Sequence, residues 1–125
     1  MDYADLLYEA AKAEDIAKVE EIVTNHGVNV RNSGNGLAAI QIAATNGDLD
    51  AIKLLLEKGA DVRFKFKKDT ALYIAAEEGH WEIVQFLLDQ AKWSPGEIKE
   101  ALLQYSSKMM NDKKLQKKVS TLSEI

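Results

Sequence analysis

The second half of the chain repeats part of the first half at a nearly constant spacing. Residues 39–62 read AIQIAATNGDLDAIKLLLEKGADV, and residues 71–92 read ALYIAAEEGHWEIVQFLLDQAK. Ala43 of the first segment corresponds to Ala75 of the second, 32 positions later. A repeat of about 33 residues is typical of helix-turn-helix units that stack side by side and are joined by β-turn loops. The repeat therefore predicts an all-α solenoid.

The residues that recur are those that a stacked helical hairpin needs. Ala43 and Ala44 are small enough to let the helix of a neighbouring unit approach closely. Gly47 follows this expected first helix, at a point where a left-handed backbone ends the helix and glycine has no Cβ penalty. Ile52 and Leu55 are three positions apart, the spacing of one buried face of a second helix.

A more divergent copy precedes these two. Residues 10–16 read AAKAEDI and lie 33 positions before the Ala43 segment. The three copies together resemble the ankyrin repeat, whose pattern is approximately TPLHxAAxxGHxxIVxxLLxxGADV. The resemblance implies an all-α ankyrin-repeat solenoid in a single domain. We expect an N-terminal capping repeat, a second repeat, a third repeat, and a C-terminal helical cap or degenerate fourth repeat, at residues 1–30, 31–62, 63–93 and 94–125.

The last quarter of the chain has helix signals but lacks the repeat's own letters. Ser94 is a typical N-cap, Pro95 suits the first helical position, and Glu97 completes a capping box. An apolar stripe follows at helical spacing, made of Ile98, Leu102, Tyr105 and Met109. We expect two amphipathic helices here, with Trp93 wedged between them and the third repeat.

Composition limits the classes of function. The 125 residues contain no cysteine, so neither a disulfide framework nor a thiolate zinc site is expected. The chain shows neither a signal peptide nor an apolar run of membrane-spanning length, which favours a cytoplasmic location and no membrane partner. The net charge of −4 argues against nucleic-acid binding. The lysine-rich C-terminal end is interpreted as a solvated helix face, and in the alternative an acidic partner docks there.

No catalytic constellation is visible. His26 is expected in a solvated loop, while the resemblance implies a structural role for His80 at the family's Gly-His position. The acidic pair Glu77-Glu78 diverges around a helix, since adjacent residues do not share a face. We therefore predict a protein that is not an enzyme and that needs neither a cofactor nor a metal.

The resemblance implies that a partner meets the hairpin fingertips and the exposed side of each first helix. The first finger includes Asn32 and Ser33. The full set of partner-binding candidates consists of Asn35, Leu37, Thr45, Asn46, Arg63, Phe64, Lys65, Phe66, Lys67, Lys68, Asp69, Glu77, Glu78 and Trp81.

The second finger is unusual, because it has two phenylalanines among four cations. Phe64 and Phe66 point the same way on an extended strand. Pointing outward, they would anchor an acidic groove with a hydrophobic floor. In the alternative, Phe64 folds under the finger and packs on the repeat below. Alternating aromatic and basic residues also suit the binding of a nucleic acid, through base stacking and phosphate contacts. The negative net charge argues against this alternative.

The sequence thus predicts a non-catalytic module that binds a folded protein through its concave face and fingertips, such as an inhibitor, an adaptor or an immunity-type protein. We expect a monomer when it is free and a complete small protein with both ends capped. In the alternative, the chain is an ankyrin segment of a larger effector or scaffold protein whose activity lies elsewhere. Nucleic-acid binding is the third and least favoured function.

Overall fold

A computed structural model describes residues 2–65 and 70–99 of the chain. The helices of this part come in pairs joined by short turns, and residues 95–99 begin a further helix. The paired helices are α1 (Tyr3–Lys12), α2 (Ile16–His26), α3 (Ala39–Asn46), α4 (Leu49–Glu57), α5 (Ala71–Glu77) and α6 (Trp81–Gln90).

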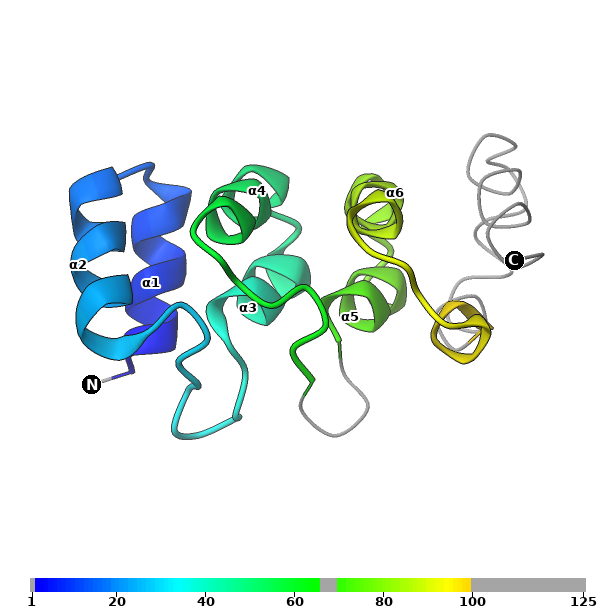
Figure 1. The fold of residues 1–125 in the computed structure, drawn as a ribbon, viewed down its shortest axis with the longest axis horizontal. Coiled ribbons are helices and arrows are strands. Elements are labelled where there is room, and N and C mark those ends of the chain that lie inside the picture. Colours follow the sequence, from blue (N-terminus) through cyan, green and yellow to red (C-terminus); the bar gives the residue numbers. More distant parts are fainter. Residues whose placement is uncertain (1, 66–69, 100–125) are drawn as a thin grey trace.

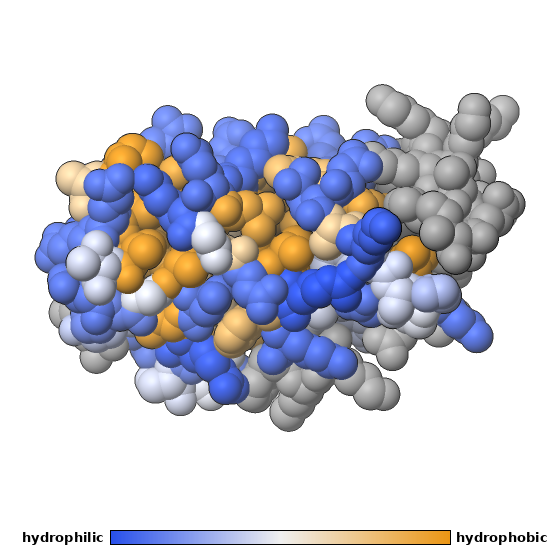
Figure 2. Space-filling model, in the orientation of Figure 1, coloured by the Kyte–Doolittle hydropathy of each residue, from blue (hydrophilic) through white to orange (hydrophobic). Residues whose placement is uncertain are grey.

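The three pairs lie side by side in a row, as Figure 1 shows. The first helices of the pairs contact one another along the row, α1 with α3 and α3 with α5. α4 and α6 form an outer layer, and α2 lies beside α1 at the N-terminal end of the row (Figure 1). The described parts of the long loops between pairs lie on the side opposite α4 and α6 (Figure 1). Figure 2 shows hydrophobic residues as an interrupted band along the stack on the viewed face, between polar margins. This is the helical solenoid that the repeat predicted.

The small residues of the repeat pack between neighbouring pairs. Ala43, Ala44 and Ala75 have no exposed surface, and Ala76 is 1% exposed. Leu55 of α4 is likewise fully buried. These contacts confirm that the recurring alanines allow first helices to approach one another. Because each pair is too small to enclose its own apolar face, the core extends through all three pairs.

The turn between the helices of a pair uses a left-handed residue. Gly47 has φ 76° and ψ 28°, and Gly79 has φ 78°. Glu14 occupies the corresponding position in the first pair and takes φ 57°, where a side chain is unfavourable. The imidazole of His80 lies against Gly47, and its Nε2 is 3.1 Å from the carbonyl oxygen of Thr45. His80 therefore links the turn of the third pair to that of the second. This agrees with the structural role that the family resemblance implies for it.

Polar caps define where several helices begin. The side chains of Asp15 and Asp48 accept hydrogen bonds from backbone N–H groups in the first turns of α2 and α4. Thr70 caps α5 in the same way. At the start of α3, where Ala38 has no cap, the Oε1 of the fully buried Gln41 accepts from the backbone N–H of Ala38 at 2.8 Å. In each case a side-chain oxygen accepts a hydrogen bond from a backbone N–H group that has no partner within the helix, because it lies at the helix start.

The predicted capping box after the third pair is present. The backbone N–H of Ser94 donates to Glu97 Oε1 at 2.8 Å, and the backbone N–H of Glu97 donates to Ser94 Oγ at 3.1 Å. Trp93 is 8% exposed, and its indole N–H donates to the carbonyl of Leu87 at 2.8 Å. Ile98 is buried. Leu102, Tyr105, Met109 and the C-terminal lysines lie outside the described residues.

The expectation that His26 is solvated is confirmed, but its expected place in a loop is wrong. His26 is the last residue of α2, and its ring stacks on Tyr3 of α1 with 3.5 Å between the ring centroids. Although His26 is exposed, it closes the first pair rather than lying in a loop. The reason is that α2 continues to the residue before Gly27, whose φ of 88° ends the helix.

Candidate protein-binding surface

The exposed residues of the first helices follow directly after the buried alanines. Thr45 and Asn46 end α3, and Glu77 and Glu78 hold the same places at the end of α5; all four are exposed. The Oγ1 of Thr45 and the Nδ2 of Asn46 each donate a 3.0 Å hydrogen bond to a carbonyl one turn earlier. Glu77 and Glu78 place negative charge at the end of α5, whereas the end of α3 is polar but uncharged.

The first finger is held against the start of α1. Asn32 Nδ2 donates to both carboxylate oxygens of Asp5 at 3.0 and 3.1 Å. Ser33 donates through its hydroxyl and its backbone N–H to Asp2 Oδ1, and these two hydrogen bonds lower the pKa of Asp2. Bonds that stabilise the charged carboxylate have this effect. The finger thus has a defined shape against the first pair.

Within this finger, two of the candidate residues differ in exposure. Asn35 is exposed at the tip, and its Oδ1 accepts from the backbone N–H of Leu37 at 2.9 Å. Leu37 is half-buried and packs against the core. Asn32 and Leu37 also pair through their backbones at 2.8 Å, next to the antiparallel bridge between Arg31 and Ala38. The tip therefore presents mainly polar groups.

Arg63 belongs to the second finger, but its side chain contacts residues outside the finger. Its Nη1 lies 2.8 Å from Glu97 Oε1, and its guanidinium lies 5.1 Å from the centroid of the Trp93 ring. Both partners follow α6, about thirty residues further along the chain. Arg63 therefore connects the second finger to the helix that begins at residue 95. This connection depends on distant residues, so the finger's own sequence did not indicate it.

The outward orientation considered for Phe64 is also wrong. Its side chain is half-buried and packs against the core, and its carbonyl accepts a long 3.4 Å hydrogen bond from Gln41 Nε2. The alternative, in which Phe64 folds under the finger, agrees with this packing. Lys65 is exposed. Phe66, Lys67, Lys68 and Asp69 lie outside the described residues.

The other candidates lie on two sides of the stack. The first finger and the described base of the second lie on the same side of the stack (Figure 1). A 3.0 Å hydrogen bond from the backbone N–H of Asp61 to Asn29 Oδ1 joins the loops at their bases. Trp81 is the first residue of α6 and is half-buried, so it belongs to the turn side of the third pair and not to the fingers. The predicted set is thus not one patch.

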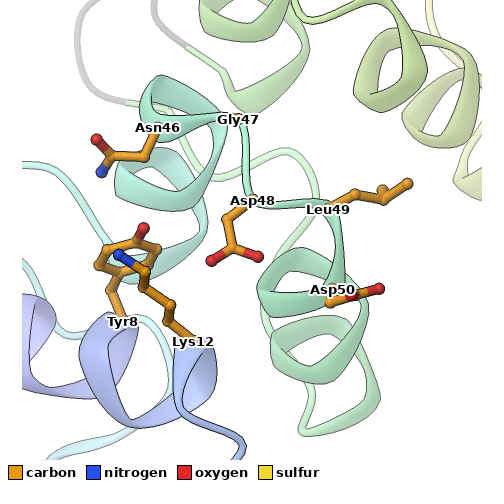
Figure 3. A pocket seen from close by; sticks show the side chains of 7 residues that line it. All are labelled: Tyr8, Lys12, Asn46, Gly47, Asp48, Leu49 and Asp50. Atoms are coloured by element: carbon orange, nitrogen blue, oxygen red, sulfur yellow. The ribbon is translucent and has the colours of Figure 1, made fainter.

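Sequence reasoning missed a pocket of about 490 Å³ between α1 and the turn that joins α3 to α4. Figure 3 shows Tyr8 and Lys12 of α1 facing Asp48 across it. Burial, together with the negative charges of Asp48 and Glu9, raises the pKa of Tyr8. Tyr8 and Asp48 lie on separate repeats, so no local motif joins them in the sequence.

Within the described residues, no group of three or more histidine, cysteine, aspartate or glutamate side chains could hold a metal ion. Across residues 2–65 and 70–99, no helix has both the length and the apolar character needed to cross a bilayer. The surface offers hydrogen-bonding groups, charges and half-buried aromatic side chains, which are the elements of a recognition surface.

Comparison with known proteins agrees with the repeat pattern. Residues 7–96 match the family described as ankyrin repeats (3 copies). Over 76 residues the chain is 40% identical to Notch-regulated ankyrin repeat-containing protein A of Danio rerio, covering 59% of this chain and 68% of that protein. The human Notch-regulated ankyrin repeat-containing protein is 34% identical over 83 residues, which are 65% of this chain and 73% of that protein.

A different kind of relative matches a shorter part of the chain. The probable E3 ubiquitin-protein ligase XBOS33 of Oryza sativa subsp. japonica is 52% identical over 50 residues, which are 39% of this chain and 10% of that protein. Similar repeats therefore occur in relatives of this chain's size and as a small part of a much longer protein.

Proposed function

Because the chain belongs to the ankyrin-repeat family, we propose that it is a non-catalytic module that binds a folded protein partner through its first-helix layer and fingertips. Ankyrin repeats are generally protein–protein interaction modules. The single observation that carries the proposed site is the row of exposed residues Thr45, Asn46, Glu77 and Glu78. Each lies one repeat from its counterpart, directly after the buried alanines of α3 or α5. Stacked repeats offer such rows as extended binding surfaces.

The proposed contact surface, called here the inner surface, combines this row with the exposed parts of the fingers. It comprises Asn35, Thr45, Asn46, Lys65, Glu77 and Glu78. Arg63 and Phe64 contribute indirectly, since they hold the second finger in position. We further propose that the free protein is a cytoplasmic monomer; the absence of cysteine suits a reducing compartment. An inhibitor, adaptor or immunity-type role remains within this proposal.

A second candidate function is that of an ankyrin segment in a larger effector or scaffold protein. The observation that favours it is the match to the rice ubiquitin ligase, of which the matching segment forms 10%. The relatives named as Notch-regulated proteins favour the first candidate, since the match covers 68% and 73% of two of them.

A charge-reversal experiment tests the proposed site. The whole chain is immobilised and used to capture proteins from a lysate of its source organism, with quantification by mass spectrometry. Glu77→Lys/Glu78→Lys reverses two exposed charges of the inner surface. Asp50→Lys/Glu57→Lys makes the same charge change at two exposed positions of α4 and serves as the matched control.

We expect at least one protein that is captured by the wild type and by the control and is lost with Glu77→Lys/Glu78→Lys; this protein is the partner of the inner surface. The variants should fold, since lysine near the C-terminal end of α5 is favourable to the helix dipole. Equal capture by all three would show that the inner surface is not the binding site. If no protein is captured specifically by the wild type, the segment of a larger protein becomes the better explanation.

A further inference from the structure

The outer layer of the stack has two hollows that share α4. One, of about 310 Å³, lies between the start of α2 and α4, where Ile16 and Leu54 provide apolar surface. The other, of about 410 Å³, lies between α4 and α6, where Leu49 and Phe86 provide it. Lys53 lines both hollows. We call this continuous area the outer surface.

The apolar part of the outer surface is accessible to solvent. Ile16 is 43% exposed and is the exposed large hydrophobic residue within residues 2–65 and 70–99. Leu49, Leu54 and Phe86 are half-buried. A single exposed apolar side chain is ordinary, but apolar floors in adjoining hollows on one face are typical of a contact surface.

The rim of the outer surface is acidic. The carboxylates that line the two hollows outnumber the cations five to one, and they are Glu14, Asp50, Glu57, Glu82 and Asp89. The ammonium of Lys53 lies 5.5 Å from the centroid of the Phe86 ring, so this cation sits at the apolar floor. Two nearby cations have partners outside the rim, since Lys18 pairs with Glu21 and Lys58 pairs with Glu20.

We propose that the outer surface binds a cationic amphipathic segment of a partner protein. Apolar side chains of that segment enter the two hollows against Ile16, Leu54 and Phe86. Its lysine or arginine side chains pair with the carboxylates of the rim, among them Asp50 and Glu57. Charge complementarity of this kind selects partners and speeds their encounter, while the desolvated apolar contacts hold them.

This interaction is separate from the one proposed for the inner surface. The outer surface is built on α4 and α6 and on the start of α2, whereas the inner surface is built on the ends of α3 and α5 and on the fingers. Figure 1 shows α4 and α6 on the side of the stack away from the fingers. There is therefore room for two partners to bind at the same time, one at each surface.

The test uses the whole chain and a defined probe, the fluorescent amphipathic peptide LKKLLKLLKKLLKL. Its binding is followed by fluorescence anisotropy, with LEELLELLEELLEL as the peptide of opposite charge. Asp50→Lys/Glu57→Lys carries the charge reversal at the outer surface, and Glu77→Lys/Glu78→Lys is its matched control. Asp50 stands in the first turn of α4 and Glu57 ends it, so the two lysines have opposing effects on the helix dipole.

We expect the lysine peptide to bind the wild type and the glutamate peptide not to bind. Asp50→Lys/Glu57→Lys should weaken binding about tenfold or more, and the matched control by about twofold or less, because local charge dominates over net charge at contact distance. Ile16→Ser should weaken binding about threefold through the lost apolar contact. Circular dichroism verifies that each variant is folded.

Two results would overturn the proposal. Equal weakening by both double variants would show attraction to net charge alone, and undetectable binding to the wild type would show that no such site exists. The chain's own lysine-rich end is the competing occupant. If the wild type self-associates with rising concentration, and Asp50→Lys/Glu57→Lys abolishes this, then the outer surface is filled by a second copy and not by a partner.

The outcomes also separate this proposal from that of the inner surface. Loss of lysate capture only with Glu77→Lys/Glu78→Lys supports the inner surface, whatever the peptide does. Loss of peptide binding only with Asp50→Lys/Glu57→Lys supports the outer surface, whatever the lysate contains. Each surface can therefore be rejected without affecting the other.

Discussion

Gly47 is constrained by its backbone and by a neighbouring side chain. Its φ of 76° is unfavourable for residues with a Cβ, and a Cβ placed there would lie 2.8 Å from Cε1 of His80. The imidazole cannot move away without losing its 3.1 Å interaction with the carbonyl of Thr45. Gly59 differs, because its φ is 96° and no atom lies within 4 Å of an added Cβ. A substitution at Gly59 therefore introduces backbone strain alone, whereas a substitution at Gly47 introduces backbone strain and a steric conflict.

We predict that Gly47→Ala destabilises the protein more than Gly59→Ala. Backbone strain should cost each variant about 1–2 kcal/mol. Gly47→Ala should lose about 1 kcal/mol more, the typical value of the hydrogen bond that His80 gives up. The free energies of unfolding are measured by urea denaturation. In a His80→Ala background the extra loss should disappear, whereas an unchanged difference would show that the imidazole does not cause it.

At the scale of elements, the helix that begins at residue 95 depends on contacts from two directions. Ser94 and Glu97 form its capping box, and Arg63 reaches Glu97 from the second finger. Burial of Glu97 favours its neutral form, but the hydrogen bonds from Ser94 and Arg63 outweigh this and lower its pKa. Because the folded-state pKa is below the unfolded one, Glu97 stabilises the fold when ionised.

This contribution should therefore be present above the ordinary glutamate pKa of 4.5 and lost as the pH falls through the lower folded-state value. Glu97→Gln keeps a side chain that suits the capping box but removes the negative charge that pairs with Arg63. We expect this variant to be less stable than the wild type by about 0.5–1 kcal/mol at about pH 7, and the difference to disappear once the pH is below the lowered folded-state pKa of Glu97. Thermal melts across this range measure the difference, and a constant difference would contradict the assignment.

The element scale also shows why the orientation of Phe64 could not be decided from the sequence of the second finger. The alternation of phenylalanine and lysine was a local pattern, and an isolated strand with that pattern has no preferred face. Phe64 packs on the core, while Arg63 bonds to Glu97, a residue 34 positions later. The positions of Arg63 and Phe64 thus depend on residues that the finger's own sequence does not contain.

At the scale of the whole molecule, stability arises between pairs. Leu55 is fully buried in the middle pair, whereas Ile16 on the outer surface is 43% exposed. A local loss in the middle should weaken both neighbours, because stacked repeats are coupled through their interfaces. The two tryptophans, Trp81 and Trp93, report on the third pair and its end.

We predict that Leu55→Ala costs about 2–5 kcal/mol of unfolding free energy, a large part of the about 5–15 kcal/mol of a typical domain. The exposed-site control Ile16→Ala should cost less than about 1 kcal/mol. Urea denaturation is followed by circular dichroism for all helices and by tryptophan fluorescence for the third pair. Both signals should shift together in Leu55→Ala. Separate transitions would show that the third pair unfolds independently of the second.

The sequence by itself determined the solenoid, its helix pairs, its buried alanines and leucines, and the capping box at Ser94. These features rest on local chemistry: helical periodicity, cap residues and the conformational freedom of glycine act within a few positions. Only the tertiary structure decided that Arg63 pairs with Glu97 and Phe64 packs on the core, that His26 stacks on Tyr3, and that apolar hollows with an acidic rim lie along the outer layer. The physical reason is that each of these depends on side chains that only the stacking of repeats brings together.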